Sequence, residues 1–240
     1  MRENLKLSVA HLYPNELNLY GDKGNILTLQ KRCQWRNIEL EFEEIEIGTN
    51  LKNHDLYFIG SGLEQQANVV LQDMLKNKDF YYSEKDSNSV FLAIDEGYKI
   101  FGKYFITENG DKIDGLSLLD TYTKSGQKRF TGNVILNNDI LDVNIVGFEN
   151  HKNLTYIEST PLGKVLQGIG NNGEDKTEGA RSKNVFGTNL HGPLLAQNPI
   201  FADYLIELAL EKRYGEKIEL TPLDNTLEQA IYDKLTAGLK

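Results

Sequence analysis

The stretch from residue 89 to residue 102 constrains the fold more than any other. It contains an apolar run, Val90–Ile94, that is interrupted at residues 95–97 before a helical pattern begins at Tyr98. A short apolar run of this length is typical of a buried strand. A strand that turns sharply into a helix and holds one reactive side chain at the turn is a nucleophile elbow. The sequence therefore predicts an elbow with Asp95 at its tip.

Strand-like and helix-like segments alternate through the first half of the chain. Such alternation is typical of a parallel sheet covered by helices, with functional groups at the carboxyl ends of the strands. The sequence therefore predicts an α/β fold. The expected strands are residues 5–12, 38–47, 55–59 and 90–94, and the expected helices are residues 26–36 and 64–76 and a segment from residue 98.

The second half of the chain is richer in strands and ends in helices. A turn at residues 109–112 indicates a hairpin, and residues 168–175 form a turn-rich loop. We expect one α/β domain with helical elements at its C-terminal end. The further strands are predicted at residues 131–136, 143–148, 155–158 and 185–190, and the further helices at residues 198–213 and 223–239.

Composition excludes several classes of function. The 240 residues carry 26 Lys and Arg against 35 Asp and Glu, a net charge of −9, which argues against nucleic-acid binding. Cys33 is the single cysteine, so no internal disulfide can form. No apolar stretch has the length of a membrane span, and the first residues lack a signal-peptide core, so we expect a cytoplasmic protein. We expect no metal site, because His11, His54 and His151 lack ligand spacing.

Asp95 and His191 each follow a predicted strand. The ends of parallel strands converge on one edge of a sheet, so these two side chains can form a dyad of nucleophile or acid with a base. Two other interpretations are open. Asp95 and Glu96 can be the N-cap and a first-turn acid of the following helix, and His191 can be a hydrogen-bonded loop residue.

Two further features can bind an anion. Arg129 lies between predicted strands and can bind a carboxylate through two hydrogen bonds, although composition alone favours a solvated surface cation. The loop Gly60, Ser61 and Gly62 can bring backbone N–H groups close to an oxyanion, although an ordinary tight turn has the same pattern.

Several segments also match a known family in the right order. Residues 92–102 resemble the elbow of the CobB/CobQ-like class I glutamine amidotransferases, whose pattern is Leu-x-Ile-Cys-Gly-Gly-Tyr-Gln-x-x-Gly. Within that family the chain looks most like the GatD-like small subunits of lipid II isoglutaminyl synthases. The other matching segments are residues 18–25, 146–151, 168–179 and 187–195.

The resemblance implies a mostly parallel, flavodoxin-like sheet flanked by helices. It implies an amidotransferase-like domain over residues 1–205 and a C-terminal helical extension, residues 206–240, packed on that domain. Members of the family release ammonia from glutamine by cysteine attack and a thioester. The implied partner is a MurT-like Mur ligase subunit, which would bind ATP and Mg²⁺ and amidate D-glutamate in the lipid II stem peptide. No cofactor is expected in this chain.

The resemblance also implies roles for single residues. Asp95 takes the nucleophile position and His191 the position of the general base. Arg129 takes the position of the arginine that binds glutamine, so glutamine or a related small carboxylate is the expected pocket ligand. The loop 60–62 takes the position of the oxyanion hole, and Glu96 adjoins it as a substrate-binding position.

The chain departs from the family pattern where the chemistry occurs. Asp95 replaces the cysteine, Glu96 a glycine, Lys99 a glutamine and Asn189 an aromatic residue. Attack by a carboxylate on an amide would give an anhydride, so we expect no glutamine hydrolysis and a structural or regulatory subunit. Two alternatives stay open: an active hydrolase or transferase of changed specificity that uses Asp95 and His191, and an introduced inactivating change.

Overall fold

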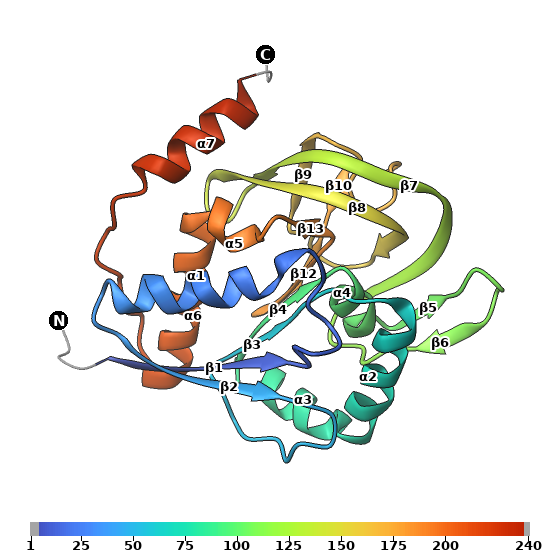
Figure 1. Cartoon of the computed structure of the whole chain (residues 1–240), viewed down its shortest axis with the longest axis horizontal. Coiled ribbons are helices and arrows are strands. Elements are labelled where there is room, and N and C mark those ends of the chain that lie inside the picture. Colours follow the sequence, from blue (N-terminus) through green and yellow to red (C-terminus); the bar gives the residue numbers. More distant parts are fainter. Residues whose placement is uncertain (1–4, 238–240) are drawn as a thin grey trace.

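The computed structural model describes residues 5–237, and six of its strands form the first sheet (Figure 1). Their order is β11-β12-β4-β3-β1-β2, and every pair except β11 with β12 is parallel. The run β2-β1-β3-β4-β12 is the flavodoxin-like order, which confirms the predicted fold class. The strands are β1 (Lys6–Leu12), β2 (Glu39–Ile45), β3 (Leu56–Ile59), β4 (Val90–Ile94), β11 (Ala180–Ser182) and β12 (Val185–Thr188).

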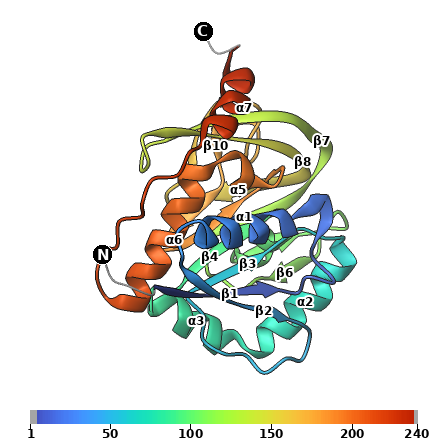
Figure 2. The same ribbon diagram turned by 60° about the vertical axis from the view of Figure 1, so that its left-hand side comes forward.

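Both faces of this sheet are apolar because helices cover both. In β3, Leu56 and Phe58 pack toward one core, while Tyr57 and Ile59 pack toward the other. Two views show the helices on either side (Figures 1 and 2). Helices α1 (Lys23–Gln34) and α6 (Pro199–Tyr214) cover the first face, and α2 (Glu64–Lys76), α3 (Lys78–Asp86) and α4 (Glu96–Phe101) cover the second.

A second sheet, mostly antiparallel, packs against the helices of the first face through Val134, Leu136 and Ile145. Its main pair is longer than predicted. Residues 131–136 and 143–148 are only parts of β7 and β8, and residues 155–157 are the end of β8 rather than a separate strand. Its strands are β5 (Tyr104–Ile106), β6 (Lys112–Asp114), β7 (Thr121–Asn138), β8 (Val143–Ile157), β9 (Gly163–Gln167), β10 (Thr177–Glu178) and β13 (Leu190–His191).

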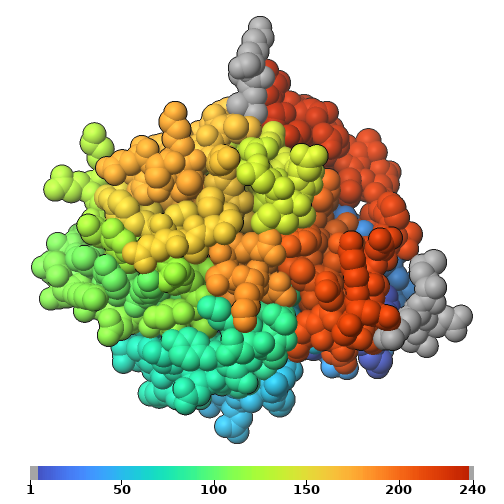
Figure 3. Space-filling model, turned by 180° about the vertical axis from the view of Figure 1, so that it is seen from behind, coloured from blue at the N-terminus to red at the C-terminus, as the bar shows by residue number. Residues whose placement is uncertain are grey.

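The C-terminal segment begins with α5 (Leu194–Gln197) and continues through α6, which runs across the division predicted at residue 205. That division stays a prediction. Beyond α6 the chain follows the edge of the molecule to α7 (Thr226–Thr236), shown in red from behind in Figure 3. Within residues 5–237, no helix is long and apolar enough to cross a membrane.

Candidate active site

The predicted site residues lie at the carboxyl edge of the parallel strands. Ser61 follows β3, Asp95 follows β4, and the loop after β1 carries Tyr20 in a short 3₁₀ turn, η1 (Leu19–Gly21). Flavodoxin-like sheets bind their ligands at this edge, near the point where the strand order reverses. The topology therefore brings together residues that are far apart in the sequence.

Asp95 forms the predicted elbow between β4 and α4. Its backbone has φ 48° and ψ −103°, a strained conformation for a residue with a side chain. The Asp95 N–H donates to the Thr188 carbonyl at 2.8 Å, which attaches the elbow to β12. A methyl group on Gly97 would lie 2.8 Å from Ile59 Cγ2, so only glycine allows α4 to begin so close to β3.

The Asp95 carboxylate is 7% exposed and hydrogen-bonded on both oxygens. Oδ2 accepts from Ser61 Oγ at 2.7 Å, and Oδ1 accepts from Asn153 Nδ2 at 3.1 Å. His191 Nε2 lies 3.7 Å from Oδ2, so the predicted dyad partners are neighbours. Burial raises the pKa of Asp95, while the hydrogen bonds and the charges of Lys99 and Arg129 oppose that rise.

Glu96 and Lys99 form a buried ion pair directly beside Asp95. The Lys99 ammonium also lies 4.7 Å from the ring centroid of Phe105, a cation–π distance. Burial raises the pKa of Glu96 to about 7, and the charge of Asp95 adds to the rise that Lys99 opposes. Asp95, Glu96 and Lys99 therefore form one interacting group of charges at the elbow.

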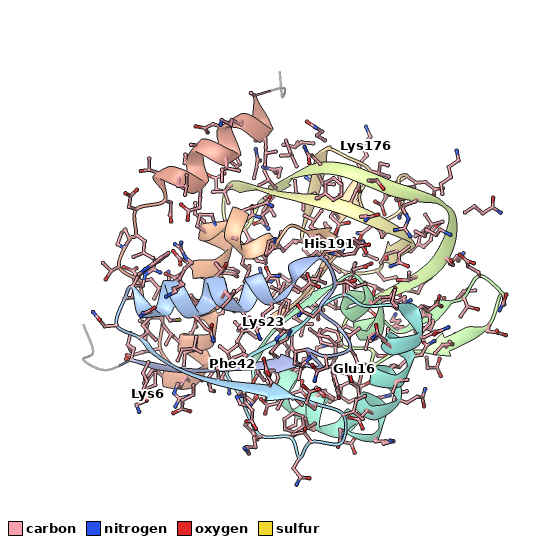
Figure 4. The ribbon with its side chains drawn as sticks, in the orientation of Figure 1. Lys6, Glu16, Lys23, Phe42, Lys176 and His191 are labelled. Atoms are coloured by element: carbon pink, nitrogen blue, oxygen red, sulfur yellow. The ribbon has the colours of Figure 1, made fainter. Side chains whose placement is uncertain are left out.

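The sequence suggested that His191 ends a strand of the parallel sheet, but in the structure it does not. β12 ends at Thr188, and the chain crosses to the second sheet, where β13 pairs with β8. His191 is 2% exposed and lies where the two sheets meet (Figure 4). Among the residues described, neither ring nitrogen has a hydrogen-bond partner, and the Tyr20 ring packs 4.6 Å away. Burial lowers the pKa of His191 to about 4.

Glu178 holds the crossing segment in place. Its Oε1 accepts hydrogen bonds from Thr188 Oγ1 at 2.7 Å and from the Asn189 N–H at 2.6 Å. Asn171 extends this network by accepting from the Gly179 N–H at 3.1 Å. Glu178 is fully buried, and burial raises its pKa to about 7. The residues just before His191 are therefore fixed by a buried polar network.

Arg129 lies inside β7 rather than between two strands, which corrects the sequence prediction. The pairing of β7 with β8 shifts register between Ser125 and Phe130, and this irregularity contains Arg129. Such bulges redirect side chains and often occur beside active sites. Arg129 is exposed and donates to Asn150 Oδ1 at 2.9 Å.

A cleft of about 290 Å³ opens above the elbow and joins residues from both sheets. Its lining includes Asp95, Glu96 and Lys99 at the elbow and Arg129 and Asn150 from β7 and β8. His191 lines a neighbouring cleft. Tyr20 and Asn150 line both clefts and are joined by a hydrogen bond of 3.2 Å. The first cleft has the charged groups and the size to hold a small amino acid.

The loop Gly60–Ser61–Gly62 packs tightly against the loop after β1. A methyl group on Gly60 would lie 2.6 Å from the Leu17 carbonyl oxygen. The Ser61 N–H donates to Asp22 Oδ2 at 2.6 Å, so this amide is not available to an oxyanion. Burial raises the pKa of Asp22 to about 7. The predicted oxyanion loop therefore lies beside Asp95, with one of its amides already bonded.

Sequence patterns gave no role in the site to Asn153, Tyr20 or Glu178, and they gave Asp22 only the role of a cap for the following helix. Asn153 reaches Asp95 from β8, and no spacing along the chain indicates that contact. The matching segment 18–25 contained the signal for Tyr20 and Asp22, although not their roles. Among residues 5–237, no three histidine, cysteine or acidic side chains come together as a metal site.

The model of the CobB/CobQ-like glutamine amidotransferase domain matches residues 8–199. The chain belongs to this family. Its relatives include subunit GatD of lipid II isoglutaminyl synthase (glutamine-hydrolyzing) from Staphylococcus aureus, with 39% identity over 93% of this chain and 92% of the relative. The GatD subunit from Streptococcus pneumoniae is 34% identical over 95% of this chain and 90% of the relative.

A solved structure with the same fold is PurLQS from Thermotoga maritima. It superposes with a TM-score of 0.59 at 13% identity, covering 89% of this chain and all of the other. At this identity the likeness shows the fold alone. The family match thus establishes the amidotransferase domain, and the similarity to a solved structure agrees with its architecture.

Proposed function

We propose that this chain is the GatD-like subunit of a lipid II isoglutaminyl synthase and has no glutaminase activity of its own. Similarity to two GatD subunits over nine-tenths of their length supports the first part. The second part rests on one observation: Asp95, a buried carboxylate, stands at the elbow where the resemblance puts the thiol. The one cysteine, Cys33, is buried in the core.

The carboxylate is unsuited to the family reaction for two physical reasons. Hydrogen bonds from Ser61 and Asn153 stabilise its charge and lower its nucleophilicity. If water attacked in place of the carboxylate, the oxyanion developing about 4 Å from the charge of Asp95 would be repelled by about 4 kcal/mol at an effective dielectric near 20. That repulsion alone slows a reaction roughly a thousandfold.

The remaining pocket still suits a small amino acid. Arg129 lines the same cleft as Asp95 and can bind a carboxylate, so we propose that glutamine or a related small carboxylate binds without being cleaved. The partner would be a MurT-like Mur ligase subunit that binds ATP and Mg²⁺ and uses free ammonia. The complex would work in the cytoplasm, where the lipid II stem peptide is made.

One observation favours a second function. The 3.7 Å separation of Asp95 Oδ2 from His191 Nε2 is close enough for the pair to act together on another ester or amide. Against this, His191 has no oriented hydrogen-bond partner among the described residues, and both oxygens of Asp95 are already bonded. The first function is therefore the better supported.

Restoring the family residues at the elbow tests the proposal. The variant Asp95→Cys/Glu96→Gly, purified with its ligase partner, should release glutamate from glutamine, because His191 and Arg129 already occupy the base and glutamine-binding positions that the resemblance implies. The matched control Asp95→Asn/Glu96→Gly removes the same charges without adding a thiol and should stay inactive. Release by the control, or none by the cysteine variant, would contradict the proposal.

A further inference from the structure

Asp95 is a buried carboxylate without a cation of this chain bound directly to it. The groups that donate to its two oxygens, the Ser61 hydroxyl and the Asn153 amide, are neutral. Among the described residues, no lysine or arginine forms an ion pair with it. Its neighbour His191 is neutral at pH 7, because burial lowers the pKa of that ring to about 4. A buried charge is costly unless an opposite charge accompanies it. The elbow therefore lacks a cation that a ligand can supply.

The two cations whose charges act on Asp95 have other partners. Lys99 forms its ion pair with Glu96, and Arg129 is exposed and donates to Asn150. With both carboxylates ionised, one negative charge at the elbow stays without a direct counter-charge. The whole lining of the cleft likewise has four acidic and three basic side chains. The cleft therefore favours a ligand with a net positive charge.

His151 presents a second hydrogen-bond acceptor in the same cleft. It is 2% exposed, and its Nδ1 donates to the Asn153 carbonyl at 3.0 Å. Burial lowers the pKa of His151 to about 4, so the ring is neutral at pH 7. Because a carbonyl can only accept, the one ring proton is on Nδ1 and Nε2 is an acceptor. Among residues 5–237, this Nε2 has no hydrogen-bond partner. A buried acceptor of this kind is a place for a donor group of a ligand.

Asn153 brings the two acceptors together. Its carbonyl accepts from His151, and its side-chain amide donates to Asp95 Oδ1. An ammonium group suits such a pair, because it carries three N–H donors and a positive charge. A primary amide has two donors and no charge, and hydrogen bonds to charged donors are roughly twice as strong as neutral ones. A ligand carboxylate has no donor and would be repelled by Asp95.

We propose that the cleft binds an amino acid whose side chain ends in an ammonium group. The α-carboxylate lies on Arg129, and the side-chain ammonium on Asp95 and His151. This inference rests on the proposed function, which keeps a pocket for a small amino acid that is not cleaved, and it names the chemical class of that ligand. Ornithine is the matched probe, because its ammonium nitrogen and the amide nitrogen of glutamine are separated from Cα by the same number of carbon atoms.

Calorimetric titration of the purified full chain at pH 8 tests the inference. The ligands are L-ornithine, L-glutamine and L-glutamate, whose side chains match in length and end in a cation, a neutral amide and an anion. L-ornithine should bind at least about tenfold more tightly than L-glutamine and at least about a hundredfold more tightly than L-glutamate. This ligand series on the unchanged chain needs no variant.

Two variants assign the preference to the elbow. Asp95→Asn keeps the shape of the side chain without its charge, so ornithine and glutamine should bind within about threefold of each other. Glu108→Gln is the matched control. It removes a negative charge from the same cleft, but Glu108 pairs with Lys152 and its side chain is 65% exposed, so the preference for ornithine should be unchanged. Thermal unfolding shows that each variant is folded.

Contrary results separate this inference from the proposed function. If glutamine binds as tightly as ornithine, or if Asp95→Asn keeps the preference, the inference is wrong and the subunit proposal stands. If none of the three ligands binds, the inference fails together with the proposed amino-acid pocket. If glutamine is converted to glutamate during its titration, the proposed loss of glutaminase activity is wrong, while tighter binding of ornithine would still support the inference.

Discussion

At the scale of single residues, Asp95 has the backbone of a nucleophile elbow and carries a carboxylate at its tip. A non-glycine residue at φ 48° persists only where surrounding contacts hold it, and here β12, Ser61 and Asn153 do so. Such strain is usual at functional sites. The conformation is thus retained, while hydrogen bonds and burial hold the carboxylate in place.

The protonation of His191 gives a first prediction. Burial lowers its pKa to about 4, so the ring should stay neutral from pH 8 down to about pH 5. NMR of the imidazole nitrogens across this range measures it directly. The variant Tyr20→Ala should raise the pKa toward its ordinary value of 6.5, because it removes a ring that packs on His191. A pKa near 6.5 in the unchanged chain would contradict the structure.

The pKa of Glu178 gives a second prediction. Burial raises the pKa of Glu178 from 4.5 to about 7 in the folded protein. Between these two pH values the folded protein keeps a proton that the unfolded chain loses. The fold is therefore destabilised as the pH rises from 4.5 to about 7. Glutamine cannot titrate. Urea unfolding should therefore show Glu178→Gln gaining roughly 3 kcal/mol relative to the unchanged chain between pH 4.5 and pH 7. A constant difference across the window would refute this.

At the scale of elements, segments with an uninterrupted apolar pattern could be predicted from the sequence, and segments without one could not. The bounds Val90–Ile94 and Glu64–Lys76 were predicted to the residue, because the apolar run and the helical spacing are both uninterrupted. Helix α3 was missed. In β7, polar residues on the open face hid a strand of 18 residues. The bulge at Arg129 depends on pairing with β8, which no local pattern records.

The packing of α1 on α6 gives a third prediction. Arg32, whose side chain is 2% exposed, donates to Asp203 at 2.6 Å, and Arg36 donates to the same carboxylate at 2.7 Å. Asp203→Asn should lower the free energy of unfolding by at least about 2 kcal/mol, because two arginines lose their counter-charge. Asp86→Asn, which breaks an exposed pair with Lys183, is the control and should cost less than about 1 kcal/mol. Equal losses in urea unfolding would be the contrary result.

At the scale of the whole molecule, the site depends on both sheets. The parallel sheet supplies the elbow and the loop after β3, while β7 and β8 supply Arg129 and Asn153. Asp95, Glu96 and Lys99, where the resemblance predicts a cysteine, a glycine and a glutamine, are neighbours in space and partly neutralise one another. The amidotransferase fold thus places a group of charges in the cleft between the two sheets.

Release of glutamate from glutamine tests this account most directly. The unchanged chain, in complex with its ligase partner and with all ligase substrates present, should release glutamate no faster than a mixture without the chain. The same complex should still amidate the acceptor when ammonium is supplied. Glutamate release at the rate of a cysteine-bearing GatD subunit assayed in parallel would contradict the central claim that Asp95 has ended the glutaminase reaction.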